Sequence, residues 1–325
     1  MLLVEYLTCM KVGVFDSGIG GLNILAEMII KASNNEYIYY ADNLNMPYGT
    51  KSESEINSGV KKAMDYFCVA NVSVVVVGCN TACCVASSVI KQYPFTTYFV
   101  TESLVKQLKT HDKVLCFATM NTVSRLELLG LENVRLIGLP TFAKEIECVA
   151  PRFYRLFGKV RNLTKQVESG EIIALGCTHY TYFKPYFESL GYTVIAETTN
   201  LNDLFSLLSL NNETGNGNKN GEILNKNGDF LGLNDENKKI NGFTIDNFSK
   251  YPNEKTVINL KNEGSEVDFN LKSEKSGLNR QKYPKIVLTN RLEIGKYYKI
   301  LRCLIPFFFR LIIETRVKSL YYKCK

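Results

Sequence analysis

The 325-residue sequence has no tryptophan, no C-x-x-C pair and no convincing secretory signal. Ten cysteines in a chain of this length are too dilute for a small disulfide-stabilised scaffold, and their spacing does not match structural zinc sites. The opening stretch carries Glu5 inside its apolar run, which makes it a poor signal peptide. We therefore expect reduced thiols, no bound metal and a cytoplasmic location.

A long uninterrupted apolar run is also missing. Val69–Ile90 carries no charge and is long enough to span a bilayer. Polar residues and a glycine nevertheless interrupt it at seven positions, namely Asn71, Ser73, Gly78, Asn80, Thr81, Ser87 and Ser88. A strand, a turn and a helix describe this segment better than a transmembrane span.

The distribution of charge does not support a nucleic-acid-binding body. Residues 281–325 hold eleven lysines and arginines against two glutamates, so this segment carries a charge of +9. The charges of the remaining residues therefore sum to −2, which gives the net charge of +7. We expect no nucleic-acid partner. The basic, aromatic stretch Tyr297–Tyr322 predicts a terminal helix docked on the first domain, with a membrane-surface helix as the alternative.

Short β-rich runs alternate with helical patterns along the chain. Helices are predicted over Leu22–Lys31 and Glu53–Ala70. Strands are predicted over Lys11–Phe15, Glu36–Tyr40, Val72–Val77, Lys113–Phe117, Val134–Gly138, Glu171–Leu175, Thr193–Ala196 and Lys285–Thr289. The valine-rich run is typical of a strand buried on both faces of a parallel sheet. The alternation predicts a doubly wound α/β fold with mostly parallel sheets.

The composition changes between Asn211 and Lys282. This stretch contains 16 asparagines, with glycine, lysine and glutamate between them. Such a segment buries too little apolar surface to offset the entropy of ordering it. We interpret it as a disordered insertion, because long structureless connectors are unusual inside a compact domain.

Two cysteines occupy matching positions at the ends of predicted strands. The strand predicted over Val72–Val77 is followed by Gly-Cys79-Asn-Thr, and the strand predicted over Glu171–Leu175 is followed by Gly-Cys177-Thr-His. A helical pattern comes after each of these turns. A cysteine at a helix N-terminus lies near free N–H groups and the positive end of the dipole, which favour a thiolate. A single such cysteine would usually be a buried thiol, and a zinc site is the other alternative. The repetition of the turn favours paired acid–base thiols.

A third turn, Asp16-Ser-Gly-Ile-Gly-Gly, also follows a strand and opens a helix. It fits neither the G-x-G-x-x-G nor the Walker phosphate pattern. The carboxylate of Asp16 suits an ammonium group, while the Ser17 hydroxyl and the helix N–H groups suit a carboxylate. Together they match the two ends of an amino acid.

The residues collectively resemble glutamate racemase. The motifs that carry the resemblance are VGVFDSGIGGL (Val12–Leu22), YYADNLNMPYGTKS (Tyr39–Ser52), VVVVGCNTA (Val74–Ala82) and ALGCTHY (Ala174–Tyr180), and KIVLTN (Lys285–Asn290) looks like the last strand of the family. The family usually has a proline where Thr181 stands. The resemblance implies a cofactor-independent enzyme with two similar α/β domains and the active site in the cleft between them.

The resemblance also implies roles for individual residues. Cys79 would remove the Cα proton of D-glutamate, and Cys177 that of L-glutamate. The residues that would bind substrate are Asp16, Ser17, Tyr48, Gly49, Asn80, Thr81, Thr178 and His179. Asp42 and Glu147 stand where the family has further acids and would support the site.

The predicted organisation follows from these assignments. Residues 11–98 and 284–313 would form the first α/β domain and 99–208 the second, with an extension at 1–10, the insertion at 209–283 and a basic tail at 314–325. An amino-acid substrate, no cofactor and a homodimer are expected. A racemase for aspartate or a related acid, or a catalytically weak member kept for binding or regulation, are the alternatives.

The insertion provides the first test. Replacing Asn212–Gln281 with a short Gly/Ser linker should leave melting and turnover nearly unchanged, because long flexible loops contribute little to stability. Thermal melts and racemisation assays of both proteins measure this. An insoluble variant, or one without a cooperative melt, would show that the segment is structural.

Overall fold

The computed structural model describes residues 10–32, 34–210, 285–288 and 294–304. Most of the expected N-terminal extension and insertion, and all of the basic tail at 314–325, lie outside these residues. The division of the chain into domains remains a prediction.

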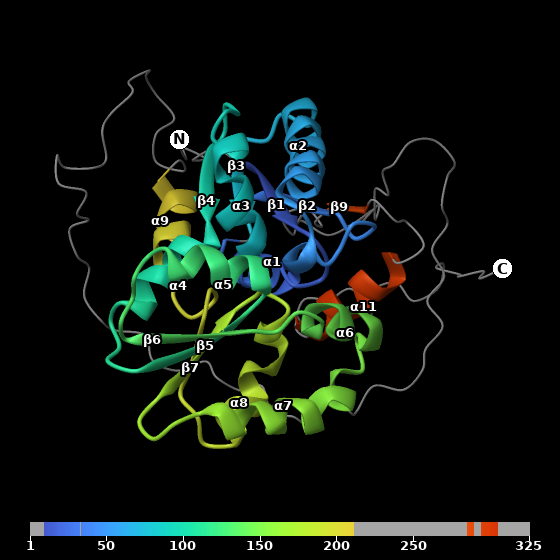
Figure 1. Ribbon diagram of the computed structural model, residues 1–325. Helices are drawn as coiled ribbons and strands as arrows, with labels where there is room; N and C mark the ends of the chain where they lie inside the picture. Colours follow the sequence, from blue (N-terminus) through green and yellow to red (C-terminus); the bar gives the residue numbers. More distant parts are fainter. Residues whose placement is uncertain (1–9, 33, 211–284, 289–293, 305–325) are drawn as a thin grey trace, which may run out of the picture.

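Two parallel sheets form the framework of the protein (Figure 1). The first has the order β4-β3-β1-β2-β9 and the second β6-β5-β7-β8. Every strand pair in both sheets is parallel. The first sheet contains β1 (Lys11–Asp16), β2 (Glu36–Ala41), β3 (Val74–Val77), β4 (Thr96–Phe99) and β9 (Lys285–Leu288). The second contains β5 (Val114–Ala118), β6 (Val134–Gly138), β7 (Ile172–Gly176) and β8 (Val194–Ala196).

Helices connect and cover the strands. They are α1 (Leu22–Lys31), α2 (Glu53–Val69), α3 (Asn80–Ile90), α4 (Val100–Leu108), α5 (Met120–Glu127), α6 (Phe142–Val149), α7 (Phe157–Leu163), α8 (Lys184–Ser189), α9 (Asn202–Leu210) and α11 (Ile294–Leu304). Short 3₁₀ turns occur at η1 (Tyr48–Thr50), η2 (Phe153–Leu156), η3 (Thr164–Gln166) and η4 (Tyr180–Phe183). Helix α2 begins at a capping box, in which Ser52 and Glu55 bind each other's backbone N–H groups.

The α/β prediction with parallel sheets is confirmed. All four residues of β3 are buried, as its valine run indicated. Strand β4 was missed by the sequence analysis, because its residues Thr-Thr-Tyr-Phe form a short, partly exposed edge strand with little apolar signal. None of the helices in the described ranges is both long and apolar enough to cross a membrane.

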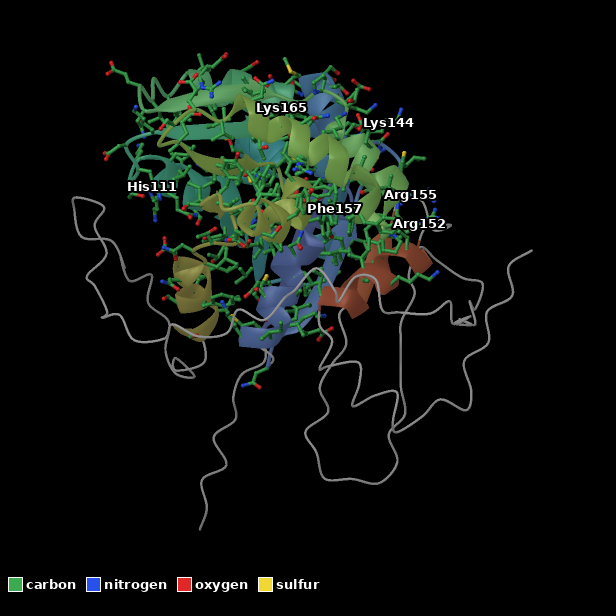
Figure 2. The ribbon with its side chains drawn as sticks, turned by 90° about the horizontal axis from the view of Figure 1, so that it is seen from below. His111, Lys144, Arg152, Arg155, Phe157 and Lys165 are labelled. Atoms are coloured by element: carbon green, nitrogen blue, oxygen red, sulfur yellow. The ribbon has the colours of Figure 1, made fainter. Side chains whose placement is uncertain are left out.

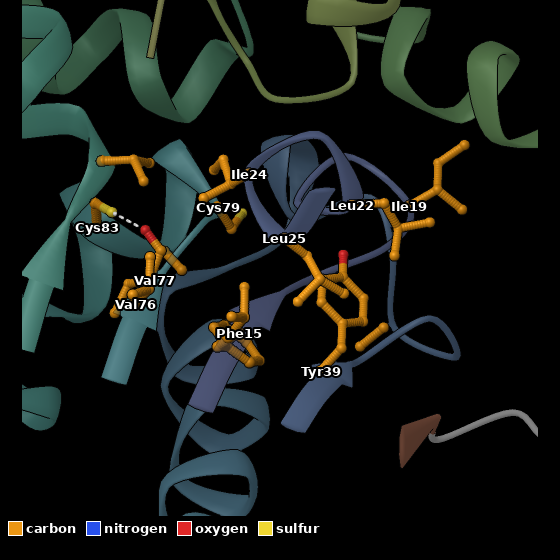
Figure 3. Packing of buried hydrophobic residues seen from close by; sticks show 14 of the residues in the cluster. Phe15, Ile19, Leu22, Ile24, Leu25, Tyr39, Val76, Val77, Cys79 and Cys83 are labelled. Carbon is orange, nitrogen blue, oxygen red and sulfur yellow. Dashed lines mark hydrogen bonds between the residues drawn. The ribbon is translucent and has the colours of Figure 1, made fainter. Parts of the chain in front are cut away.

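A buried apolar layer holds the first sheet between its helices (Figure 3). Phe15 of β1, the valines of β3 and Ile24 and Leu25 of α1 all belong to this cluster, and Cys79, at the carboxyl end of β3, is buried in it as well. Helix α11 packs on α1 and buries Tyr297 and Ile300. The last described helix therefore completes the first sheet's cover.

The carboxyl ends of the two sheets meet. Thr178, after β7, donates a hydrogen bond to Asp16 at the end of β1, and Thr119, after β5, lies 2.9 Å from Thr81 at the start of α3. Residues that follow strands in either sheet are therefore brought to one junction, as expected for ligand sites in open α/β sheets.

Close packing at Gly13 generates a stability prediction. A Cβ atom at this position would lie 2.9 Å from the buried ring of Phe67. We expect Gly13→Ala to destabilise the fold by roughly 1–3 kcal/mol, as overpacking does. The matched control is Gly158→Ala, where a Cβ meets nothing within 4 Å and helix α7 should gain about 0.5–1 kcal/mol.

Urea denaturation of the two variants measures both changes. Equal stability of the two alanine variants would contradict the packing argument.

Candidate active site

Cys79 occupies the N-cap position of α3, directly after β3. Its thiol is buried and donates to the Ser17 hydroxyl at 3.6 Å. The strand–glycine–cysteine–helix turn predicted for this segment is therefore present. The structure brings Ser17, which belongs to the turn after β1, against the first thiol.

The hydrogen bond from the helix terminus acts on Cys79 in the expected direction, but burial opposes it. Burial raises the pKa of Cys79 well above its ordinary value, and the negative charge of Asp16 raises it further. Hydrogen bonds from the Ala82 backbone and Ser17 lower the pKa but do not outweigh burial. Cys79 is therefore a protonated thiol, suited to donate a proton.

Cys177 follows β7 and has different neighbours. Its Sγ lies 3.9 Å from Nδ1 of His179, and Nε2 of the same ring lies 3.1 Å from Oε1 of Glu147. Burial lowers the pKa of His179, but its hydrogen bonds and electrostatic interactions with Cys177 and Glu147 together raise it well above 6.5. The second thiol thus lies beside a positively charged imidazole.

Glu147 joins the two sheets. It projects from α6, and its Oε1 also accepts the backbone N–H of Ile19 at 2.6 Å, while its Oε2 accepts Nζ of Lys296 at 2.8 Å. Burial raises the pKa of this carboxyl, yet the His179 and Lys296 contacts lower it below its ordinary value. Glu147 is therefore a buried carboxylate with donors on both oxygens.

Asp16 lies between the two thiol turns. It accepts the Gly18 backbone N–H at 2.8 Å and the Thr178 hydroxyl at 3.0 Å. Burial raises its pKa to about 6, although the positive charge of His179 acts in the opposite direction. A buried carboxyl of this kind would gain from an ammonium partner.

The predicted loop residues form a second group beside Cys79. The Tyr48 hydroxyl donates to Asp42 at 2.6 Å in the interior, and burial followed by the charge of Asp42 raises the pKa of this tyrosine. Gly49 leaves room for Thr119, since a Cβ at position 49 would lie 2.5 Å from its side chain. Asp42 thus supports Tyr48.

Asn80 and Thr81 begin α3 with polar groups directed inward. Oδ1 of Asn80 accepts the Thr101 hydroxyl at 2.7 Å, whereas its Nδ2 is buried without a hydrogen-bond partner among the described residues. The hydroxyl groups of Thr81, Thr119 and Thr122 lie within 2.9–3.3 Å of one another. These groups can bind a carboxylate.

Several residues of this region were not predicted from the sequence. Thr119 and Thr122 follow β5, so the position of Thr119 at a strand end could have indicated it. Lys296 and Glu197 carried no recognisable signal, because their partners lie on elements distant in sequence. Among residues 10–32, 34–210, 285–288 and 294–304, no three His, Cys, Asp or Glu side chains form a group that could hold a metal ion.

Glu197 is a fully buried acid at the end of β8. Its Oε1 accepts the hydroxyl of Thr181 at 2.7 Å, and its Oε2 has no hydrogen-bond partner in the described part of the chain. Burial raises its pKa from 4.5 to about 7. A proline at position 181 could not make this bond, because it lacks a donor.

Glu197 generates a prediction for stability against pH. The folded protein keeps a proton on Glu197 that the unfolded chain loses above about pH 4.5, so stability falls as the pH rises from 4.5 to 7. We expect Glu197→Gln to remove this loss and to be more stable than the natural chain at pH 8, by up to about 3 kcal/mol. Denaturation at pH 5 and pH 8 measures the difference, with exposed Glu127→Gln as the control. An identical pH dependence of Glu197→Gln and the natural chain would contradict the assignment.

No protein-family model matches the chain. A glutamate racemase of Campylobacter concisus is 34% identical over 192 residues, which cover 54% of this chain and 72% of that protein. The crystal structure of glutamate racemase from Francisella tularensis in complex with D-glutamate is 25% identical, with a TM-score of 0.54 over 66% of this chain and 86% of the other.

A glutamate racemase isoform from Bacillus anthracis is 22% identical, with a TM-score of 0.56 over 62% of this chain and 82% of that one, and it supports the fold alone. The paired strand-end cysteines, the two parallel sheets and the 34% identity to a relative covered over 72% of its length agree with one another. The chain belongs to the aspartate/glutamate racemase superfamily, as an amino-acid racemase of the glutamate racemase-like type.

Proposed function

We propose that the protein interconverts L-glutamate and D-glutamate by a two-base mechanism in which Cys79 and Cys177 act on opposite faces of the α-carbon. The observation that carries this proposal is the pair of buried thiols at the meeting ends of the two sheets, each in its own electrostatic environment. Relatives such as the Campylobacter concisus protein bear the name glutamate racemase, which supports glutamate as substrate.

The mechanism needs a base on one face of the substrate and an acid on the other. Cys177, beside the charged ring of His179, would remove the α-proton of L-glutamate, and the protonated Cys79 would deliver a proton to the opposite face. The reverse direction exchanges the two roles. Two thiols supply both proton transfers, so we propose no cofactor.

Polar groups around the thiols would hold the substrate. Asp16 would pair with the α-ammonium group, with Ser17 and Thr178 beside it. The unpartnered Nδ2 of Asn80 and the hydroxyls near Thr81 would donate to a carboxylate, where fixed donors stabilise developing negative charge.

Contacts between the sheets would exclude water from this junction. The Tyr182 hydroxyl donates to the Ile19 carbonyl at 2.7 Å, and Nδ2 of Asn121 donates to the carbonyls of Tyr48 and Lys51 at 3.0 and 2.9 Å. Exclusion of water protects a carbanion-like species from stray protons. The homodimer and the cytoplasmic location remain predictions.

The two thiols can be tested separately. Cys79→Ala and Cys177→Ala should each abolish racemisation of glutamate. In D₂O, Cys79→Ala should still exchange the α-proton of L-glutamate, and Cys177→Ala that of D-glutamate, because each keeps one base. Proton NMR follows loss of the α-proton, and circular dichroism follows inversion.

Single enantiomers of aspartate serve as the parallel substrate series, and buried Cys116→Ala, which lies in β5 within the second sheet, as the matched cysteine control. Equal residual exchange of both enantiomers in both variants would overturn the two-base assignment. Faster turnover of aspartate than glutamate by the natural chain would overturn the substrate assignment.

A further inference from the structure

Lys296 ends a chain of contacts that begins at Cys177. The Cys177 Sγ lies 3.9 Å from Nδ1 of His179, Nε2 of that ring lies 3.1 Å from Oε1 of Glu147, and Oε2 of the same carboxylate lies 2.8 Å from Nζ of Lys296. The four side chains come from the turn after β7, from α6 and from α11. They are all largely buried, with Lys296 the most exposed at 17% of its side chain.

Helix α11 fixes Lys296 in this position. Tyr297, Ile300 and Leu301 are at most 1% exposed and anchor the helix in the core beside α1. Nζ of Lys296 also lies 3.5 Å from the backbone carbonyl of Glu147. The ammonium group therefore contacts both the side chain and the backbone of one residue on α6.

The Oε2 atom of Glu147 needs a donor such as Lys296, because the donors from Ile19 and His179 both lie at Oε1. Oε1 accepts both the Ile19 N–H and the His179 ring, so Oε2 would otherwise face the interior without these donors. A buried carboxylate without a donor on one oxygen is costly. The lysine therefore fixes which oxygen of Glu147 faces the histidine.

We propose that Lys296 is a positioning residue for proton transfer at Cys177, because it holds Glu147 so that Oε1 of this carboxylate fixes His179. The positive charge of Lys296 also weakens the hold of the Glu147 carboxylate on the imidazole proton. The inference rests on the proposed function, because His179 affects the reaction only if Cys177 moves a proton. It assigns helix α11 a part in the chemistry of the second sheet.

The charged groups around His179 and Glu147 determine in which direction the pKa of His179 moves when Lys296 is replaced. His179 faces Cys177, Glu147 and Asp16, and the charge of Glu147 also reaches Tyr39. Removal of the positive charge of Lys296 must raise the proton affinity of the groups it faces. The pKa of His179 should therefore rise in Lys296→Met. A site that only loosened and admitted water would show a fall of that pKa toward 6.5 instead.

The composition of the chain makes this measurement direct. It contains two histidines, and His111 lies on the far side of the second sheet from α11 (Figure 2). Two-dimensional NMR of the imidazole rings, titrated from pH 4 to pH 10, resolves His179 with His111 as the internal reference. The His179 ring reports loss of its own proton at high pH.

We expect the loss of the His179 proton to move upward by about one pH unit in Lys296→Met and to stay in place in Lys296→Arg. The control is Lys299→Met, which removes an exposed charge from the same helix. An unchanged transition in Lys296→Met, or a downward shift of it, would overturn the proposal.

Kinetics provide the second measurement. Lys296→Met should lower kcat/KM for glutamate by roughly tenfold, a small part of a full acid–base contribution, and should move the alkaline limb of its pH profile upward. Lys296→Arg should restore both. If the natural chain does not racemise glutamate, the proposed function fails, whereas the NMR titration still shows whether Lys296 acts on Glu147 and His179.

Discussion

The organisation of the candidate active site depends on the hydrogen bonds that the buried carboxylate of Glu147 accepts. Their donors come from the turn after β1, the turn after β7 and helix α11, three segments far apart in the sequence. An ionised carboxylate is costly to bury unless such donors surround it. The junction of the two sheets therefore has to assemble as one unit, and the environment of the second thiol is set by that assembly.

The two thiol turns look alike in sequence but differ in electrostatics. Cys79 is buried near Asp16, and both burial and that negative charge keep it protonated. Cys177 instead lies beside His179, whose ring is held charged by Glu147. Under the proposed two-base mechanism, this asymmetry would separate an acid from a base in a site with approximate symmetry.

Close approach of the backbones reinforces this arrangement. A Cβ at Gly18 would lie within 2.0 Å of Oε1 of Glu147, and one at Gly20 within 2.3 Å of the Thr178 hydroxyl. The glycines of the first turn therefore let the first sheet's loop contact the second sheet's polar groups directly. The same turn carries Asp16 and Ser17, so packing and chemistry are coupled at this point.

The sequence by itself determined the α/β class, the parallel sheets and the strand-end turns that contain Cys79, Cys177 and Asp16, because strand and helix periodicity and glycine turns are local properties. Its motifs also indicated the racemase family. The tertiary structure decided the protonation of Cys79, the polar cluster with Thr119 and Thr122, and the buried acid Glu197. It also decided the contact of Lys296 with Glu147. These depend on burial and on contacts between segments up to 149 residues apart, and a local pattern carries no information about the charge or solvent that such a fold places around a side chain.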